Sequence, residues 1–323
     1  MGRDGARAWV SELQPGTEVD ESYVVRSRDV RQRRGGGPYL ALTLGDRTGE
    51  VTALVWENVD ALGKVLEVGA VAAVTGQVQR YNQRLQVVVR RAAPVPENEV
   101  DESLYVRSSS VDPDVLWQRL EGLVEGVDNQ HLRQLLFRIL ADPGVAARLR
   151  VAPAARSMHH AFRSGLLEHT VSMATIGRQM ARHYDLDESL VVAGCVLHDL
   201  GKIWELDVSP SIEYTDDGRL LGHLTLEVLH VDRIIAEMPS FPDELRRHLL
   251  HLLLAHHGEY EYGSPRRPKT PEALLVHVVD LLDSKMAGMI EAINADGDPD
   301  QAWSPYSRIL DRFIYRRRPS NDT

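Results

Sequence analysis

The sequence places histidine and aspartate residues at spacings that suit a divalent metal site. His198 and Asp199 are adjacent, so an imidazole nitrogen and a carboxylate oxygen lie side by side near one helix end. Further histidines and carboxylates flank this pair along the chain: His169, His223, His256, His257, Asp280 and Asp283. Borderline metals accept nitrogen and oxygen ligands together. The scattered His/Asp set therefore predicts the site of a metal-dependent hydrolase.

The apolar surroundings of these residues favour one shared site over a set of unrelated core histidines. Asp199 follows the apolar run 191–197, and Asp280 lies within the apolar stretch 274–282. An ionised carboxylate at such a position is costly unless it is paired or metal-bound. Ordinary core packing would explain one buried histidine, but it would have to be invoked separately at each position. A single metal centre explains them together.

Length and composition indicate a globular protein with room for two domains. The chain has 323 residues, of which 43% are hydrophobic and 26% are charged, and such a chain can bury a sizeable core. Its charged N-terminus lacks the apolar run of a signal peptide, and the stretch 190–197 is too short to span a bilayer. The single cysteine, Cys195, excludes an intrachain disulfide. We expect a cytoplasmic protein with no membrane partner.

Charge is divided unevenly along the chain. Residues 22–95 carry 11 Lys and Arg against 6 Asp and Glu, a net of +5, although the whole chain has a net charge of −10. Residues 96–323 carry 24 basic against 36 acidic side chains, a net of −12. A basic surface attracts phosphates. The pattern predicts a basic module joined to an acidic one, with a different task for each.

Hydrophobic periodicity predicts the fold of the first module. Between residues 18 and 95, apolar residues alternate in short runs, as at Leu40, Leu42 and Leu44, and turns such as 45–49 separate the runs. This pattern is typical of antiparallel strands. Five short strands with one helical break fit an OB-type β-barrel. We therefore predict a multi-domain protein in which an antiparallel barrel precedes the metal-type residues.

The second module is predicted to be all α-helical. After residue 96, leucines recur at helical spacing, as at Leu116, Leu120 and Leu123. The helix that leads to His198 is expected to end at Gly201. The predicted organisation is a leader (1–17), an OB-fold nucleic-acid-binding domain (18–95), a linker with a helical segment (96–150), a metal-dependent helical domain (151–318) and a tail (319–323).

The order of the metal-type residues resembles the HD phosphohydrolase superfamily, and Lys202 completes the extended His-Asp-x-Gly-Lys form of its motif. The resemblance implies two divalent metal ions. The first would be held by His169, His198, Asp199 and Asp280, and the second by Asp199 as a bridge, His223, and one or both of His256 and His257. Manganese is the expected metal, with iron, cobalt and magnesium as alternatives. Asp199 and Lys202 are the expected catalytic residues, since Lys202 would stabilise charge on phosphoryl oxygens.

Longer segments narrow the resemblance to YhaM-type 3′–5′ exoribonucleases. These are residues 159–169, 256–265, 268–273 and 280–286, and the turn 44–49 is similar to the OB module of that family. The resemblance implies a metal-dependent 3′–5′ exoribonuclease that acts on single-stranded RNA. It would release nucleoside 5′-monophosphates through attack of metal-activated water, and single-stranded DNA is left open as a substrate. Residues beyond Asp296 match no motif of the family.

Two other functions stay open from the sequence: an HD phosphohydrolase of nucleotides or cyclic dinucleotides with a regulatory OB domain, and a non-catalytic nucleic-acid-binding protein. Bases stack on aromatic side chains beside basic ones in OB folds. The expected substrate-binding residues are His159, His160, Asp283, Arg47, Trp56, Tyr81 and Arg84. For Asp283, one helical turn after Asp280, orientation of a metal ligand is the alternative. A homo-oligomer is also left open.

Overall fold

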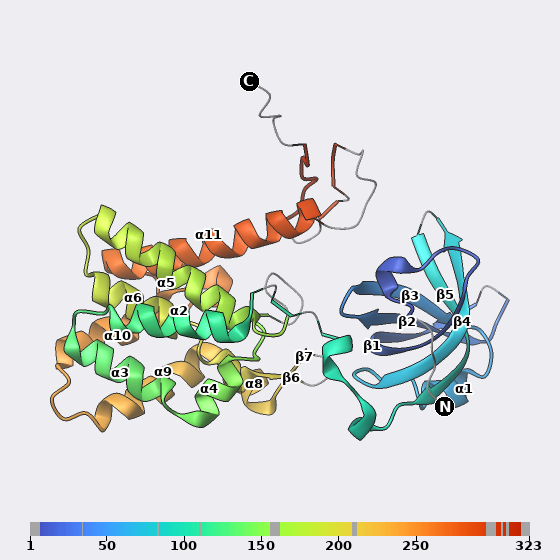
Figure 1. Ribbon diagram of the computed structural model, residues 1–323, viewed down its shortest axis with the longest axis horizontal. Helices are drawn as coiled ribbons and strands as arrows, with labels where there is room; N and C mark the ends of the chain where they lie inside the picture. Colours follow the sequence, from blue (N-terminus) through green and yellow to red (C-terminus); the bar gives the residue numbers. More distant parts are fainter. Residues whose placement is uncertain are drawn as a thin grey trace. The chain divides into compact units, whose positions relative to one another are not determined.

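The chain folds into two compact units. The structure, a computed structural model, describes residues 7–33, 35–82, 84–106, 108–109, 111–155, 162–208, 212–294, 302–304, 306–307 and 310–317. The first unit comprises residues 1–108 with 208–212, and the second comprises 109–207 with 213–323. The first contains a closed barrel and the second is mainly helical (Figure 1). No helix in the described part of the chain is long and apolar enough to cross a membrane.

The barrel has five strands in the spatial order β1-β2-β3-β5-β4. Its elements are β1 (Glu18–Gln32), β2 (Pro38–Asp46), β3 (Gly49–Val55), α1 (Val59–Gly63), β4 (Val71–Tyr81) and β5 (Arg84–Pro94), flanked by the 3-10 turns η1 (Val10–Glu12), η2 (Glu97–Glu99) and η3 (Glu102–Leu104). Neighbouring strands are antiparallel except β3 and β5, which pair in parallel and close the barrel. Five strands with one helical break confirm the predicted OB-type architecture.

The alternating leucines of β2 form part of the barrel core. Leu40, Leu42 and Leu44 are each no more than 2% exposed. In the β2–β3 register Leu42 lies opposite Ala53, which is also buried. Period-two side chains therefore fill the interior, as alternation in a half-buried strand requires.

The segment that follows β5 packs against the barrel. Tyr105 is 2% exposed in a small cluster with Val24 and Val71, and its hydroxyl donates a hydrogen bond of 2.8 Å to Ser22 Oγ. The sequence prediction ended the barrel domain at residue 95, whereas the compact unit continues to Ser108. The difference arises because a buried tyrosine beyond the last strand fixes this segment to the barrel.

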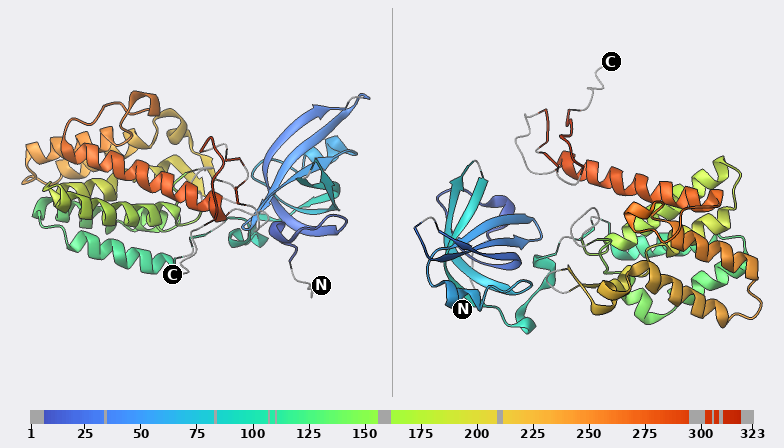
Figure 2. Two further views of the ribbon diagram at one scale, coloured as in Figure 1. Left: turned by 90° about the horizontal axis from the view of Figure 1, so that it is seen from above. Right: turned by 180° about the vertical axis from the view of Figure 1, so that it is seen from behind.

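The helical unit is built around α6 (Glu188–Leu197), in which every residue from Ser189 onward is buried. The Asp187 side chain caps this helix by accepting a hydrogen bond of 2.9 Å from the Leu190 amide. Helix α6 packs against α3, α5, α10 and α11, and α5 also lies beside α11 (Figure 2). The other elements are α2 (Pro113–Glu125), α3 (Gln130–Leu140), α4 (Pro143–Leu149), α5 (Gly165–His183), α7 (Lys202–Glu205), β6 (Leu206–Val208), β7 (Ile212–Tyr214), α8 (Asp216–Leu220), α9 (His223–Ala236), α10 (Asp243–Ala255), η4 (Tyr260–Tyr262) and α11 (Pro271–Asn294).

Gly76 permits the close approach of β4 and β5. The register of the two strands shifts between Thr75 and Gly76, and a Cβ atom at Gly76 would lie 2.4 Å from the carbonyl oxygen of Val88. Gly76→Ala is therefore expected to destabilise the barrel by about 1–3 kcal/mol, the usual cost of overpacking. Denaturant unfolding of the full-length protein measures this loss. Gly35→Ala is the matched control because a Cβ there meets nothing within 4 Å; equal stability of the two variants would contradict the account.

Candidate metal centre

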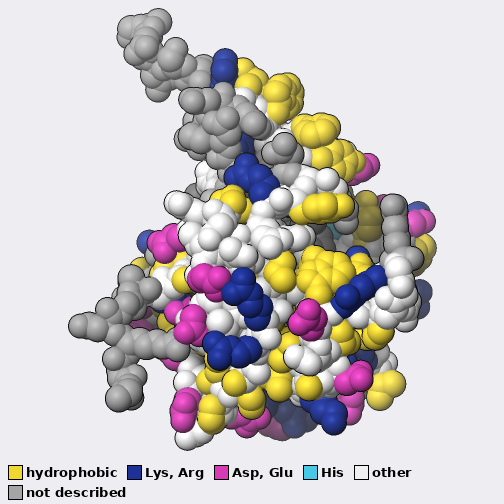
Figure 3. Space-filling view, turned by 90° about the vertical axis from the view of Figure 1, so that its right-hand side faces the viewer, with side chains coloured by type: hydrophobic (Ala, Val, Ile, Leu, Met, Phe, Trp, Pro, Cys, Tyr) yellow, Lys and Arg dark blue, Asp and Glu magenta, His cyan; other side chains and the backbone are white. Residues whose placement is uncertain are grey.

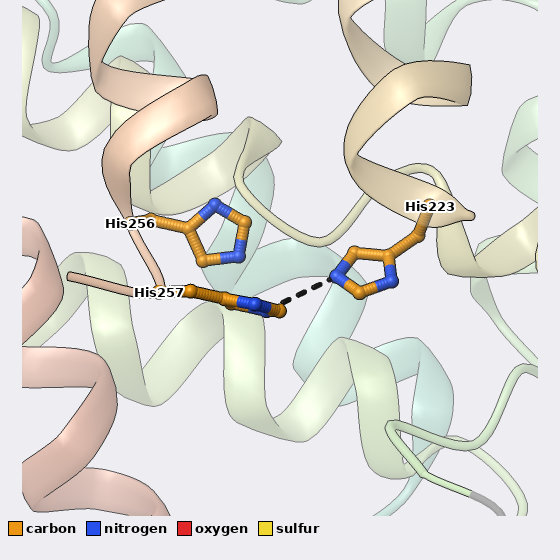
Figure 4. A group of neighbouring side chains, drawn as sticks. All are labelled: His223, His256 and His257. Carbon is orange, nitrogen blue, oxygen red and sulfur yellow. Dashed lines mark hydrogen bonds between the residues drawn. The ribbon is translucent and has the colours of Figure 1, made fainter. Parts of the chain in front are cut away.

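Two groups of three side chains converge inside the helical unit. The ligand atoms of each group lie within 4.8 Å of one another: His169, His198 and Asp280 form one group, and His223, His256 and His257 form the other. Helix ends bring most of them together, because His223 begins α9, His198 follows α6, and His256 follows α10. Figure 4 shows the second group, in which Nε2 of His223 lies 3.3 Å from Nε2 of His257.

Asp199 lies between the two groups and presents one carboxylate oxygen to each. Its Oδ2 atom is 3.3 Å from Nε2 of His198 and 3.8 Å from Nε2 of His169. Its Oδ1 atom is 3.6 Å from Nε2 of His223 and 3.7 Å from Nε2 of His256. A single carboxylate placed in this way can bridge two cations.

Backbone carbonyl groups fix the orientation of three of these imidazoles. Nδ1 donates to a carbonyl oxygen in each: His198 to Cys195 at 2.9 Å, His256 to Leu253 at 2.8 Å and His257 to Tyr262 at 2.9 Å. Because a carbonyl only accepts, the neutral ring then carries its lone pair on Nε2. Nε2 of His256 is buried and has no hydrogen-bond partner. The Nε2 lone pairs of these three imidazoles are thus available to coordinate, and this set of nitrogen ligands fits a divalent metal ion.

Carboxylates contact the Nδ1 atoms of the other two histidines. Nδ1 of His169 lies 2.7 Å from Oδ2 of Asp283, and Nδ1 of His223 lies 3.1 Å from Oε1 of Glu205. A carboxylate in this position orients a ligating imidazole and raises its basicity. Asp283 therefore contacts a metal-type histidine, and the described pocket lining includes its neighbour Ser284 but not Asp283 itself.

Neighbouring groups and burial shift the pKa values of several side chains in the centre. Burial would raise the pKa of Asp199, but the charge of Lys202 and the adjacent His198 ring outweigh it and hold this pKa well below its usual range. Nζ of Lys202 donates to Oδ2 of Asp199 at 2.7 Å. Burial lowers the pKa of His256 to about 3. For His169, burial is outweighed by hydrogen bonds to Asp280 and Asp283, which raise its pKa to about 9.

A pocket of about 570 Å³ opens onto this centre. The metal-type side chains His169, Asp199 and Asp280 contribute to its inner wall. The described lining residues outside the two ligand groups include Lys202, Tyr214, Tyr262, His277, Lys285 and Leu310. A mixture of apolar, aromatic and cationic walls beside metal-type ligands suits a small phosphorylated group such as a nucleotide.

Three residues near the centre were not predicted from the sequence. Glu205 contacts His223 as described, and Nδ1 of His277 donates to the His256 carbonyl at 2.8 Å. Glu227 is fully buried with Oε1 3.8 Å from Nδ1 of His256, and burial beside the charge of Asp199 raises its pKa well above the usual range. The available signal was a lone acidic residue in the mostly apolar run 224–231. Each of these three residues lies against a histidine of the second group, at its ring or its backbone.

The expected substrate-binding residues of the barrel fall in different places. Trp56 stacks on Tyr39 with ring centroids 4.6 Å apart, and the Arg33 guanidinium lies 5.3 Å from the Trp56 ring. Arg47 instead lies over the Trp9 ring at 4.4 Å. Tyr81, Arg84 and Arg47 are all exposed. On the face drawn in Figure 3, basic side chains are interspersed with acidic and apolar ones. His159 and His160 lie outside the described residues.

Comparison with known families follows the same division. The family model of the HD domain matches residues 166–285, and that of the OB-fold nucleic acid binding domain matches residues 23–95. The fold and site thus define an HD-domain protein, of a metal-dependent phosphohydrolase family, with an N-terminal OB fold. Among solved structures, the second OB-fold domain of replication protein A from Methanococcus maripaludis is 21% identical, with a TM-score of 0.24; the match covers 30% of this chain and 98% of that one.

Whole-length relatives identify the family. The 3′-5′ exoribonuclease YhaM of Bacillus velezensis is 32% identical over 280 residues, which is 86% of this chain and 88% of the relative. The proteins of the same name from Bacillus subtilis and Halalkalibacterium halodurans are also 32% identical, over 86% and 87% of this chain and 88% and 87% of their own lengths. The chain belongs to the YhaM 3′-5′ exoribonuclease family.

The raised pKa of His169 predicts how metal uptake depends on pH. In the metal-free protein His169 holds a proton below a pH of about 9, and a ligand must lose its proton before it binds a metal. Metal affinity of chelator-stripped protein should therefore rise as the pH rises from 6.5 towards 9, with release of a proton on binding. Calorimetric titration with Mn²⁺ in buffers of different ionisation enthalpy measures both. An affinity independent of pH over this range would contradict the assignment of His169 as a ligand.

Proposed function

We propose that the protein is a metal-dependent 3′–5′ exoribonuclease that removes nucleoside 5′-monophosphates from single-stranded RNA. The observation that carries the proposal is the position of Asp199, whose two oxygens lie between two histidine groups at a pocket of nucleotide size. Membership in the YhaM family supports the direction of degradation. Activity on single-stranded DNA is a second, separately testable part of the proposal.

We propose two divalent ions per chain, with manganese as the expected metal. Asp199 would be shared, His169, His198 and Asp280 would complete one set, and His223, His256 and His257 would complete the other. When bound, the ions would supply positive charge for the scissile phosphate and lower the pKa of water. The arrangement of Nε2 atoms and carboxylate oxygens supports this stoichiometry.

Two lysine side chains would add positive charge beside the phosphate of a bound phosphodiester. Lys202 lies at the inner wall, bonded to Asp199, and Lys285 of α11 lines the same pocket. We assign Lys202 to the phosphoryl oxygens, whose charge grows as the bond breaks. Tyr262 of the pocket wall lies beside His257, whose ring it orients through its carbonyl, and its side chain can stack a terminal base.

The barrel would hold the strand. Tyr39, Trp56 and Arg33 form a stacked cluster beside the β1–β2 turn, and Tyr81 and Arg84 flank the β4–β5 turn. OB folds bind oligonucleotides on strands 2 and 3 and on these two loops. A cytoplasmic location and a homo-oligomer stay predictions from the sequence.

The function is tested by product analysis with purified metal-loaded protein. A 5′-labelled single-stranded RNA should shorten step by step, nucleoside 5′-monophosphates should accumulate, and a circular RNA of the same sequence should resist. A single-stranded DNA of the same sequence tests the second substrate. Hydrolysis of nucleoside triphosphates or cyclic dinucleotides, with linear RNA left intact, would overturn the proposal and favour a small-molecule phosphohydrolase.

Lys202→Ala should lower kcat by about a hundredfold, because one preorganised donor to developing charge contributes about that much. The apparent KM should change far less, and the metal content should be retained. Lys269→Ala is the matched control, since Lys269 is exposed and lies outside the pocket lining. Steady-state RNA hydrolysis measures both variants. A wild-type rate for Lys202→Ala would show that this lysine only neutralises Asp199.

A further inference from the structure

The C-terminal segment forms a hairpin on the helical unit. Within residues 302–317, isolated bridges join Trp303 to Tyr315 and Ser307 to Arg312. The Ser304 amide donates to the Ile314 carbonyl at 2.8 Å, and the Ile314 amide donates to Ser304 Oγ at 3.0 Å. Ser304, Ile314 and Leu310 are buried. We call these described residues the C-terminal hairpin; it lies near the end of α11 (Figure 1).

The outer side of this hairpin is aromatic and exposed. Trp303, Tyr306, Phe313 and Tyr315 are 53%, 48%, 58% and 51% exposed. They pair across the hairpin, with centroids 5.0 Å apart for Trp303 and Tyr315 and 5.1 Å apart for Tyr306 and Phe313. Four aromatic side chains gathered on a surface and left half in solvent indicate a binding surface.

Charge distinguishes this surface from the rest of the helical region. The stretch 302–317 contains four arginines and one aspartate, although residues 96–323 together carry more acidic than basic side chains. Arg312 and Arg317 are exposed next to the aromatic pairs. In a two-fold contact between copies, this basic patch would meet itself and repel. A polyanion with flat apolar groups complements both its charge and its aromatic faces.

The hairpin also adjoins the metal pocket. Leu310 lines that pocket together with Lys285 and Gly288 of α11, and a Cβ atom at Gly288 would lie 3.7 Å from Leu310 Cδ2. Leu310, a buried residue of the hairpin, is thus part of the pocket wall. A strand whose terminal nucleotide occupies the pocket must leave past one of its walls.

We propose that the outer face of the C-terminal hairpin is a second binding surface for single-stranded nucleic acid, which stacks the nucleotides next to the one in the metal pocket. The inference rests on the proposed nuclease function and extends it to a segment that matched no motif. Bases stack on Trp303, Tyr306, Phe313 and Tyr315, and the exposed Arg312 and Arg317 contact the phosphates. The surface is independent of the barrel in sequence and in fold.

The test is the binding of fluorescent RNA strands, from a dinucleotide upward, to full-length protein in chelator, so that no strand is cut. Tyr306→Ala combined with Phe313→Ala should weaken binding of long strands at least about fivefold, the lower end of the contribution of one stacked base. Arg312→Glu with Arg317→Glu should weaken it further at low salt, and the deficit should shrink as the strand is shortened. Tyr184→Ala and Arg148→Glu, at exposed positions elsewhere in the helical unit, are the controls.

The outcomes separate the inference from the function on which it rests. Unchanged affinity of the aromatic and arginine variants, with wild-type protein that degrades RNA, would overturn the hairpin surface alone. Wild-type protein that neither binds nor degrades RNA would overturn the proposed function. A wild-type oligomer in sedimentation that becomes monomeric in the aromatic variant, with RNA affinity retained, would show that the hairpin binds a second copy and would also overturn the inference. Metal content and melting temperature equal to wild type verify that each variant is folded.

Discussion

The Asp199 carboxylate is the interaction on which the helical unit depends. Its two oxygens face two histidine groups. Lys202 and the surrounding imidazoles stabilise its negative charge although the carboxylate is buried. An isolated carboxylate at 3% exposure would be strongly disfavoured. The end of α6, the start of α9 and the end of α10 therefore meet at the Asp199 carboxylate, with α5 and α11 beside it. The contacts that stabilise this carboxylate also position the metal-type side chains.

Close helix packing makes this meeting possible, and glycines allow it. A Cβ atom at Gly201 would lie 2.1 Å from the His223 carbonyl oxygen, and one at Gly194 would lie 2.2 Å from Cδ2 of Leu252. The first brings the start of α9 against the His-Asp segment, and the second brings α10 against α6. Gly258, with φ of +79°, turns the chain directly after His257 under the His277 ring. Small residues thus set the separation of the ligands.

The sequence alone predicted those features of the fold and site that follow from local residue patterns. The alternation around Leu42, the apolar run before His198 and the order of histidines and aspartates predicted the barrel, the buried helix and the family. The sequence did not predict features that depend on contacts between segments far apart in the chain. The parallel β3–β5 pairing, the burial of Tyr105 and the contact of Asp283 with His169 leave no periodic pattern in the sequence. Gly201 was expected to end the helix that leads to His198. Helix α6 ends at Leu197, and Gly201, with φ of −57°, instead permits the close approach of α9.

Metal stoichiometry tests the central claim, that one carboxylate organises two metal sites, most directly. Elemental analysis of purified protein should find two divalent ions per chain in wild type. Asp199→Asn should lose both, because each site uses one of its oxygens, whereas His257→Ala should retain the ion of the His169 group. Circular dichroism confirms that each variant is folded. Asp199→Asn protein that still holds two ions, or wild-type protein saturated by one, would contradict the account.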